Sequence, residues 1–136
     1  MLSTYRVFVF AESFSNAFQT PELSYLASFY TRIPGYLNAI LSSPRLTLLI
    51  PPKAAFDALG PITDAELVEI LDYHTMINGF LGYTPTLQDG KTYRTKSGGV
   101  FVVSRRGRDV FINDAKIVKK NYILSNGVAQ LLDKVI

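Results

Sequence analysis

His74 is the only histidine in the chain, and Tyr73 precedes it directly. An imidazole is the side chain whose ordinary pKa lies nearest neutrality, so a general base in this protein would be His74, with Tyr73 beside it. His74 also falls on an apolar stripe of the sequence, which favours a core histidine that is hydrogen-bonded to a buried partner. We expect the core position and therefore lean against an enzyme, while the catalytic alternative stays open at this point.

A second group of candidate residues is cationic. Residues 1–90 carry four Lys or Arg and eight Asp or Glu, whereas residues 91–136 carry ten and three. A basic surface attracts acidic polysaccharides, lipid headgroups or nucleic acids, although such side chains can also serve only to keep exposed strands soluble. No aromatic-interleaved RNA-binding signature accompanies them, so nucleic acid is not expected as a partner. The cations expected on one binding face are Arg105, Arg106 and Arg108, with Lys96, Lys119 and Lys120.

Composition limits the other chemistry. The chain has no cysteine, which excludes disulfides and thiolate metal sites, and we expect no metal and no cofactor. With 136 residues, of which 48% are hydrophobic and 18% charged, it is expected to form one globular domain. No apolar run reaches the roughly 18 residues of a membrane span, and Val7–Ala11 is too short for a signal-peptide core. The protein is thus expected either to be intracellular or to have lost a leader.

Two short helices and a strand are the first elements that the sequence predicts. Apolar residues recur at helical spacing in 23–33 and 37–41, and Pro34 with Gly35 interrupts the pattern between them. The apolar run at 46–50 then predicts a strand.

Two further helices are predicted in the middle of the chain. Pro51 ends the preceding strand because it has no N–H to donate, and the helix that follows is expected to bury Phe56 and Leu59. The clearest helix is predicted over Thr63–Ile77, since Thr63 and Glu66 form a capping box before an apolar stripe. Three of its carboxylates are expected to form a solvated face and not a catalytic pair: Glu66, Glu69 and Asp72.

The last third of the chain predicts strands. Residues 100–104 and 110–112 are expected to pair as a hairpin, with the three arginines in its turn. Asn126 and Gly127 are expected to tolerate the positive φ of a tight turn. The final strand, 128–136, is apolar on both sides of its alternation and is expected to be covered on both faces.

The sequence resembles the fasciclin (FAS1) domain family in three separate blocks. The first is the strand–Pro–helix segment, and the second is the Tyr-His pair, which Tyr73 and His74 reproduce. The third is the C-terminal strand, in which Gln130 stands where many members carry a histidine. The residues that match the first and third blocks are Thr47, Pro51, Ala55 and Phe56, and Asn126, Gly127, Val128, Asp133 and Val135.

The resemblance implies a single FAS1 domain at residues 22–136, preceded by an N-terminal extension at residues 1–21 whose role is open. It implies an α+β fold, in which a β-sandwich or wedge has helices packed along one side. Members are mostly extracellular or cell-surface modules that act through protein or carbohydrate contacts without a cofactor. The resemblance therefore implies an extracellular or cell-surface location, although no signal peptide is visible in this chain.

Three functions are compatible with this resemblance. The first is a non-catalytic binding module for cell adhesion, cell-surface or matrix interactions, whose partner is a protein or an anionic polysaccharide. The second is an enzyme or auxiliary protein acting on a small molecule, since some fungal members belong to natural-product pathways; a pocket beside His74 would favour it. The third is a structural surface protein that self-associates into homo-oligomers, which an exposed apolar edge at Tyr5–Phe10 would favour.

The resemblance also implies a second set of candidate partner-binding residues. In some animal members the Tyr-His region and an Asp-Ile pair are implicated in integrin binding. The Asp-Ile pair aligns here with Asn121 and Tyr122, so the motif is only half preserved. Tyr73, His74, Asn121 and Tyr122 are accordingly candidates beside the three arginines.

Overall fold

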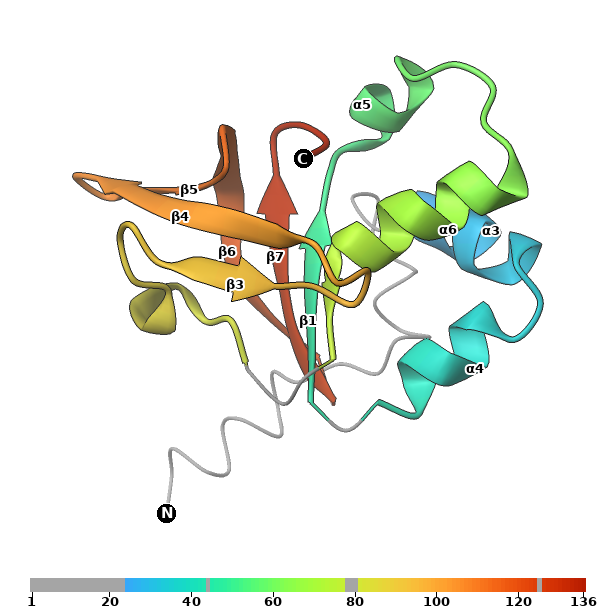
Figure 1. The fold of residues 1–136 in the computed structure, drawn as a ribbon, viewed down its shortest axis with the longest axis horizontal. Coiled ribbons are helices and arrows are strands. Elements are labelled where there is room, and N and C mark those ends of the chain that lie inside the picture. The colour runs from blue at the N-terminus through green and yellow to red at the C-terminus, as the bar shows by residue number, and fades with distance from the viewer. Residues whose placement is uncertain (1–23, 44, 78–80, 125) are drawn as a thin grey trace.

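The computed structural model describes residues 24–43, 45–77, 81–124 and 126–136. The α-helices lie on one side of the molecule and the strands on the other (Figure 1), which confirms the predicted α+β fold. The predicted N-terminal extension, residues 1–21, and the run Tyr5–Phe10 lie outside the described residues. The helices are α3 (Ser24–Arg32), α4 (Tyr36–Leu41), α5 (Lys53–Asp57) and α6 (Asp64–Tyr73), with a 3-10 helix, η1, at Thr84–Thr86.

Within the described ranges, seven strands form one sheet in the order β2-β1-β7-β6-β5-β4-β3. β1 and β7 pair in parallel, and the other neighbours pair antiparallel. Just beyond β3, the backbone N–H of Lys96 donates to the carbonyl of Thr75 in β2 at 2.7 Å, so the two edges of the curved sheet nearly meet. The strands are β1 (Leu46–Ile50), β2 (Thr75–Met76), β3 (Thr92–Arg94), β4 (Val100–Arg106), β5 (Asp109–Ile112), β6 (Ala115–Leu124) and β7 (Gly127–Leu132).

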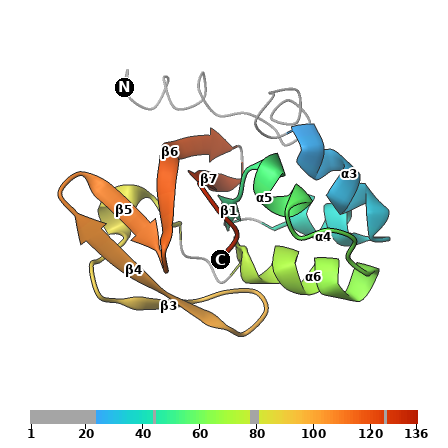
Figure 2. The same ribbon diagram turned by 90° about the horizontal axis from the view of Figure 1, so that it is seen from above.

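β1 and β7 occupy the centre of the fold, between the helices and the outer strands (Figures 1 and 2). Every residue of both strands is buried. In β1, Leu48 and Ile50 belong to the core packed by the helices, whereas Leu49 belongs to a second core enclosed by the sheet. Burial on both faces explains why these runs are almost continuously apolar. The predicted two-sided burial of the last strand is confirmed, but β7 ends at Leu132 instead of residue 136.

α6 begins as predicted but ends earlier. The capping box is present, since Thr63 and Glu66 each accept the other's backbone N–H through their side chains. The helix ends at Tyr73 instead of Ile77, because the next residues turn into β2 and pair with β1. This pairing buries Met76 in the core enclosed by the sheet and leaves Ile77 43% exposed. Strand pairing thus overrides the helical spacing of the sequence.

The other predicted elements are confirmed with one exception. α3 and α4 are separated at Gly35, whose φ of 79° only glycine adopts readily. β4 and β5 form the predicted hairpin, and β1 is followed by a helix that buries Phe56. Leu59 is not buried with it: its side chain is 44% exposed, because α5 ends at Asp57 and the chain turns away from the core.

Gly127 is required by a close backbone approach and not by a positive φ. The positive φ expected at Asn126 and Gly127 is wrong, since neither residue is in the left-handed region. An added Cβ at residue 127 would instead lie 1.9 Å from the carbonyl oxygen of Leu46, its partner in the first rung of the β1–β7 pair. Asn126 supports this junction, because its side-chain amide donates to the carbonyls of Ile40 and Ser43 at 3.2 and 2.9 Å.

Replacing Gly127 by alanine is expected to destabilise the protein by about 2–4 kcal/mol, because the new methyl group would force β1 and β7 apart. Gly107→Ala is the matched control. Gly107 has a φ of 62° and open space around the position of a Cβ, so that change costs only the strain of a left-handed alanine, about 1 kcal/mol. Urea unfolding of both variants measures the difference; equal losses would contradict the close approach.

Candidate binding site

His74 is buried, with 4% of its surface exposed, at the C-terminal end of α6. Its Nδ1 lies 2.7 Å from the carbonyl oxygen of Ile70, and the backbone N–H of Ile136 donates to Nε2 at 3.0 Å. Because the Ile136 amide can only donate, Nε2 is the acceptor and the proton resides on Nδ1. Both ring nitrogens are therefore used within the domain, as expected for a core histidine.

The environment of His74 favours a ring that is neutral near pH 7. Burial lowers its pKa to about 4, and the bond to the Ile70 carbonyl opposes this shift only in part. A hollow lies nearby, lined by Tyr73, Ser97 and Gly99 among others, but His74 is not part of its lining. A pocket beside His74 would have favoured catalysis, but this hollow opens onto Tyr73 and not onto the imidazole.

Tyr73 links α6 to the outer strands. Its hydroxyl donates to the carbonyl of Val100 at 2.6 Å and accepts from the side-chain amide of Asn113 at 3.2 Å. Its ring stands perpendicular to that of His74, with ring centres 6.0 Å apart. Tyr73 therefore holds the start of β4 and the β5–β6 turn against the end of α6.

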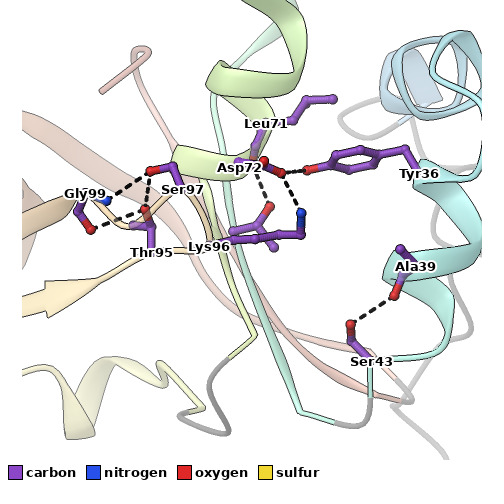
Figure 3. Close-up of polar contacts among 10 residues, drawn as sticks. Tyr36, Ala39, Ser43, Leu71, Asp72, Thr95, Lys96, Ser97 and Gly99 are labelled. Atoms are coloured by element: carbon purple, nitrogen blue, oxygen red, sulfur yellow. Dashed lines mark hydrogen bonds and ion pairs between the residues drawn. The ribbon is translucent and has the colours of Figure 1, made fainter. Parts of the chain in front are cut away.

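Asp72 lies between Tyr36 of α4 and Lys96 of the β3–β4 loop (Figure 3). The Tyr36 hydroxyl donates to Oδ1 of Asp72 at 2.7 Å, and Nζ of Lys96 lies 2.9 Å from the same oxygen. Burial, and next the hydrogen bond to Asp72, raises the pKa of Tyr36, so its hydroxyl remains a donor. The predicted solvated face is wrong for Asp72, because α4 and the β3–β4 loop pack around it.

Arg105 is turned toward the loop that precedes β3. Its Nη1 donates to the carbonyls of Thr84 and Leu87 at 2.6 and 2.8 Å, and its backbone N–H donates to Oδ1 of Asp89 at 2.7 Å. The Thr84 carbonyl, in η1, also accepts from the backbone N–H of Leu87 at 3.3 Å, so Nη1 of Arg105 bridges η1 and the residue that follows it. Arg105 therefore caps this loop, which is a structural task, although the sequence placed it with the binding cations.

Four other cations gather near the β4–β5 turn, and we call this group the cationic turn. The guanidinium of Arg106 lies 4.9 Å from the centre of the Phe111 ring. Nζ of Lys120 donates to the backbone carbonyl of Arg108 at 2.6 Å, which brings β6 against the turn. Lys116 lies 3.5 Å from the Asp109 carboxylate. The cationic turn comprises Arg106, Arg108, Lys116 and Lys120, around Asp109.

The candidates do not form one site. Lys96 lies beyond the opposite end of β4 from Arg106, and at about 3.3 Å per residue the seven-residue strand separates the two by about 20 Å. Tyr73 is at the Lys96 end, through its bond to Val100. Asn121 lies within β6, and Tyr122 pairs with Ala129 of β7. The side chains of Asn121 and Tyr122 lie outside the described part of the structure.

Sequence reasoning missed two members of these arrangements. Lys116 was not among the binding candidates, although β6 pairs Lys116 with Phe111 and so places it beside Arg106. Asn113 was also missed. The Asn-Asp dipeptide at 113–114 is a turn signal that could have identified it, and in the β5–β6 turn Asn113 does adopt a positive φ, of 53°. In the described ranges, no three His, Cys, Asp or Glu side chains gather as metal ligands would.

The fold and the site define an α+β module with a curved, nearly closed sheet and a charged turn at one end. The sequence model of the fasciclin domain matches residues 21–136, so the chain belongs to the fasciclin (FAS1) domain family, a family of adhesion-type binding modules. No helix of the described residues has both the length and the apolar character needed to cross a bilayer.

Two known proteins extend this comparison. The chain is 30% identical over 93 residues to the fasciclin-like arabinogalactan protein CTB11 of Cercospora beticola, which covers 65% of this chain and 25% of that protein. It is also similar to the FAS1 domain pair of the insect cell adhesion molecule fasciclin I, with a TM-score of 0.68 over 85% of this chain and 45% of the other. At 17% identity, the second similarity concerns the fold alone. This chain thus spans a quarter of the curated relative and less than half of the solved one.

The neutral His74 predicts a specific pH dependence of stability. Its pKa is about 4 in the folded protein and about 6.5 when unfolded, so the unfolded state binds more protons between these values. The lowered pKa of His74 therefore makes the free energy of unfolding depend on pH. Stability is highest above about pH 6.5, and about 2–3 kcal/mol of it is lost as the pH falls to about 4. Urea unfolding from pH 4 to 7.5 measures this loss.

His74→Asn is the matched variant, because its amide can still donate to the Ile70 carbonyl but cannot titrate. The stability difference between wild type and variant should shrink as the pH falls through this window. A difference that stays constant would show that His74 does not lose its proton affinity on folding. His74→Ala, which also leaves a cavity, is expected to cost about 2–4 kcal/mol at pH 7.

Arg105 and Arg108 should respond differently to alanine. Arg105→Ala removes the donor to two carbonyls and is expected to cost about 1–2 kcal/mol, allowing for its partial exposure. Arg108→Ala, in the exposed turn, should cost less than about 0.5 kcal/mol. Hydrogen exchange of residues 84–90 should accelerate only in the Arg105 variant; unchanged exchange there would rule out the capping role.

Proposed function

We propose that this FAS1 domain is a non-catalytic binding module of the cell surface or matrix, and that the cationic turn contacts an anionic polysaccharide. The observation that carries the proposal is the convergence of Arg106, Arg108, Lys116 and Lys120 from two hairpins onto one turn. Exposed charges act together only within a Debye length, about 8 Å at physiological salt. The four cations are linked by shared neighbours: Arg106 and Lys116 flank Phe111, and Lys120 binds the backbone of Arg108. Lys96, by contrast, lies about 20 Å from Arg106.

The chemistry of the turn suits a flexible polyanion. Asp109 is paired with one of the four cations, Lys116. The guanidinium of Arg106 lies over the Phe111 ring, and its N–H groups can still bind sulfate or carboxylate oxygens in pairs. Lys116 and Lys120 add point charges along β6. A repeating anionic chain could satisfy several of them at once without entering a pocket.

Two considerations support a binding role over catalysis. The sole imidazole is buried, neutral and bonded at both nitrogens, so it offers no free base. Tyr73 is committed to Val100 and Asn113. The family to which the chain belongs, and the arabinogalactan and adhesion names of its relatives, support a place at the cell surface.

A charge-reversal experiment tests the proposed surface. The variant Arg106→Glu, Arg108→Glu, Lys120→Glu should abolish binding of the full chain to heparin and polygalacturonate, measured by titration calorimetry, at a temperature where its melting curve shows that it is fully folded. Wild-type binding should weaken about tenfold or more when salt rises from about 50 to 300 mM, because screening shortens the range of exposed charges. Neutral dextran should not bind at either salt concentration.

The control reverses the same number of charges at dispersed positions, with Lys53→Glu, Arg94→Glu and Lys134→Glu. Both triple variants change the net charge equally, so only the location differs. If the control loses binding as completely as the first variant, net charge and not the cationic turn is responsible. Binding retained by the first variant would move attention to the Tyr73 end of β4.

A further inference from the structure

A second hollow lies on the other side of the central strands, where α3, the β1–α5 junction, β6 and β7 converge. Figure 2 shows α5 close to β7, with α3 beyond it. The hollow has a volume of about 190 Å³. It is open to solvent where Pro52, Lys53 and Val118 are exposed. Its lining consists of Tyr25, Ile50, Pro51, Pro52, Lys53, Val118, Leu131 and Leu132.

The interior of this hollow offers almost no polar chemistry. The hydroxyl of Tyr25 donates to the carbonyl of Pro51, so these two polar atoms satisfy each other. Burial raises the pKa of Tyr25, which keeps that hydroxyl protonated and in place as the donor. At the rim, Nζ of Lys53 is paired with Asp57 at 2.9 Å. A ligand inside would therefore meet aliphatic and aromatic carbon and no unsatisfied donor or acceptor.

The walls of the hollow are fixed before any ligand arrives. Ile50 and Leu131 are partners in the last rung of the β1–β7 pair, and Pro51 fixes the direction in which the chain leaves β1. The ring of Tyr25 is held by Phe29 and Phe56, each with ring centres 5.8 Å away. A pre-formed site avoids the free-energy cost of ordering its own side chains on binding.

Val118 is at the mouth for a structural reason. The pairing of β6 with β7 shifts register between Ile117 and Lys119, so Val118 is passed over in the ladder. Val118 is 59% exposed, more than any other large aliphatic residue in the described ranges. An apolar group that covers so exposed a valine removes apolar surface from water, which favours binding.

We infer that this hollow binds a small apolar molecule, a single aromatic ring or a short alkyl chain of about six to nine non-hydrogen atoms. The size follows from the volume: a cavity of about 150 Å³ lined by aliphatic and aromatic side chains stays dry and takes up benzene. The chemical class follows from the lining, which would leave a polar group at the closed end of the hollow unpaired. This site is separate from the proposed function, since neither His74 nor any residue of the cationic turn lines it.

Methyl-detected NMR of the full chain tests the inference with toluene as the probe. Toluene should cause saturable shifts confined to the methyl groups of Ile50, Val118, Leu131 and Leu132, with a dissociation constant on the order of 1 mM because so few atoms are buried. Hydroquinone, which is close to toluene in size but carries hydroxyls at both ends that cannot both face the open mouth, should bind at least about tenfold more weakly. Shifts spread over the whole molecule, or equal binding of both probes, would overturn the proposal.

A pair of matched variants locates the site. Val118→Phe places a ring over the mouth from an exposed position and should weaken toluene binding at least about tenfold by occupying the space. Val102→Phe makes the same change at an exposed valine of β4, outside the lining, and should leave binding unchanged. The triple variant of the cationic turn should bind toluene like the wild type. Failure of the polysaccharide proposal can therefore be distinguished from failure of the proposal for this hollow. Unaltered toluene binding in Val118→Phe would exclude this hollow as the site.

Discussion

The parallel pairing of β1 with β7 is the constraint on which the rest of the structure depends. Two runs separated by most of the chain must lie so close at their first rung that residue 127 can have no side chain. Once paired, they present one face to the helices and the other to the space inside the curved sheet. Polar side chains complete the unit on that inner face: Thr47 accepts the N–H of Gly82, and Gln130 donates to the Gly82 carbonyl. The β1–β7 pair thus contributes to both cores and also holds the loop at Gly82 in place.

Local features of the fold could be predicted from the sequence because their causes lie within a few residues. Thr63 and Glu66 cap each other, Pro51 ends a strand by lacking a donor, and the β4–β5 turn lies between two runs of strand formers. Features that depend on distant partners could not. The end of α6 is set by pairing of Thr75 and Met76 with β1, and the reason for Gly127 is an atom of Leu46.

The candidate site shows the same division. The charge asymmetry of the chain identified the basic third, and the apolar stripe identified His74 as a core residue. Neither could reveal that Nε2 of His74 meets the Ile136 amide, 62 residues away in sequence. Neighbouring arginines also diverge, because alternate residues of a strand point to opposite faces. Arg106 lies on the Phe111 ring, whereas Arg105 is directed to the carbonyls of Thr84 and Leu87.

The contact between the two edges of the sheet has a consequence for association between copies of the domain. β2 has two residues and β3 has three, and the Lys96–Thr75 bond turns these edge strands toward each other. An intruding strand from another molecule would find too few unpaired backbone groups there to form a stable ladder. These edges therefore offer a poor template for amyloid-like growth of this sheet.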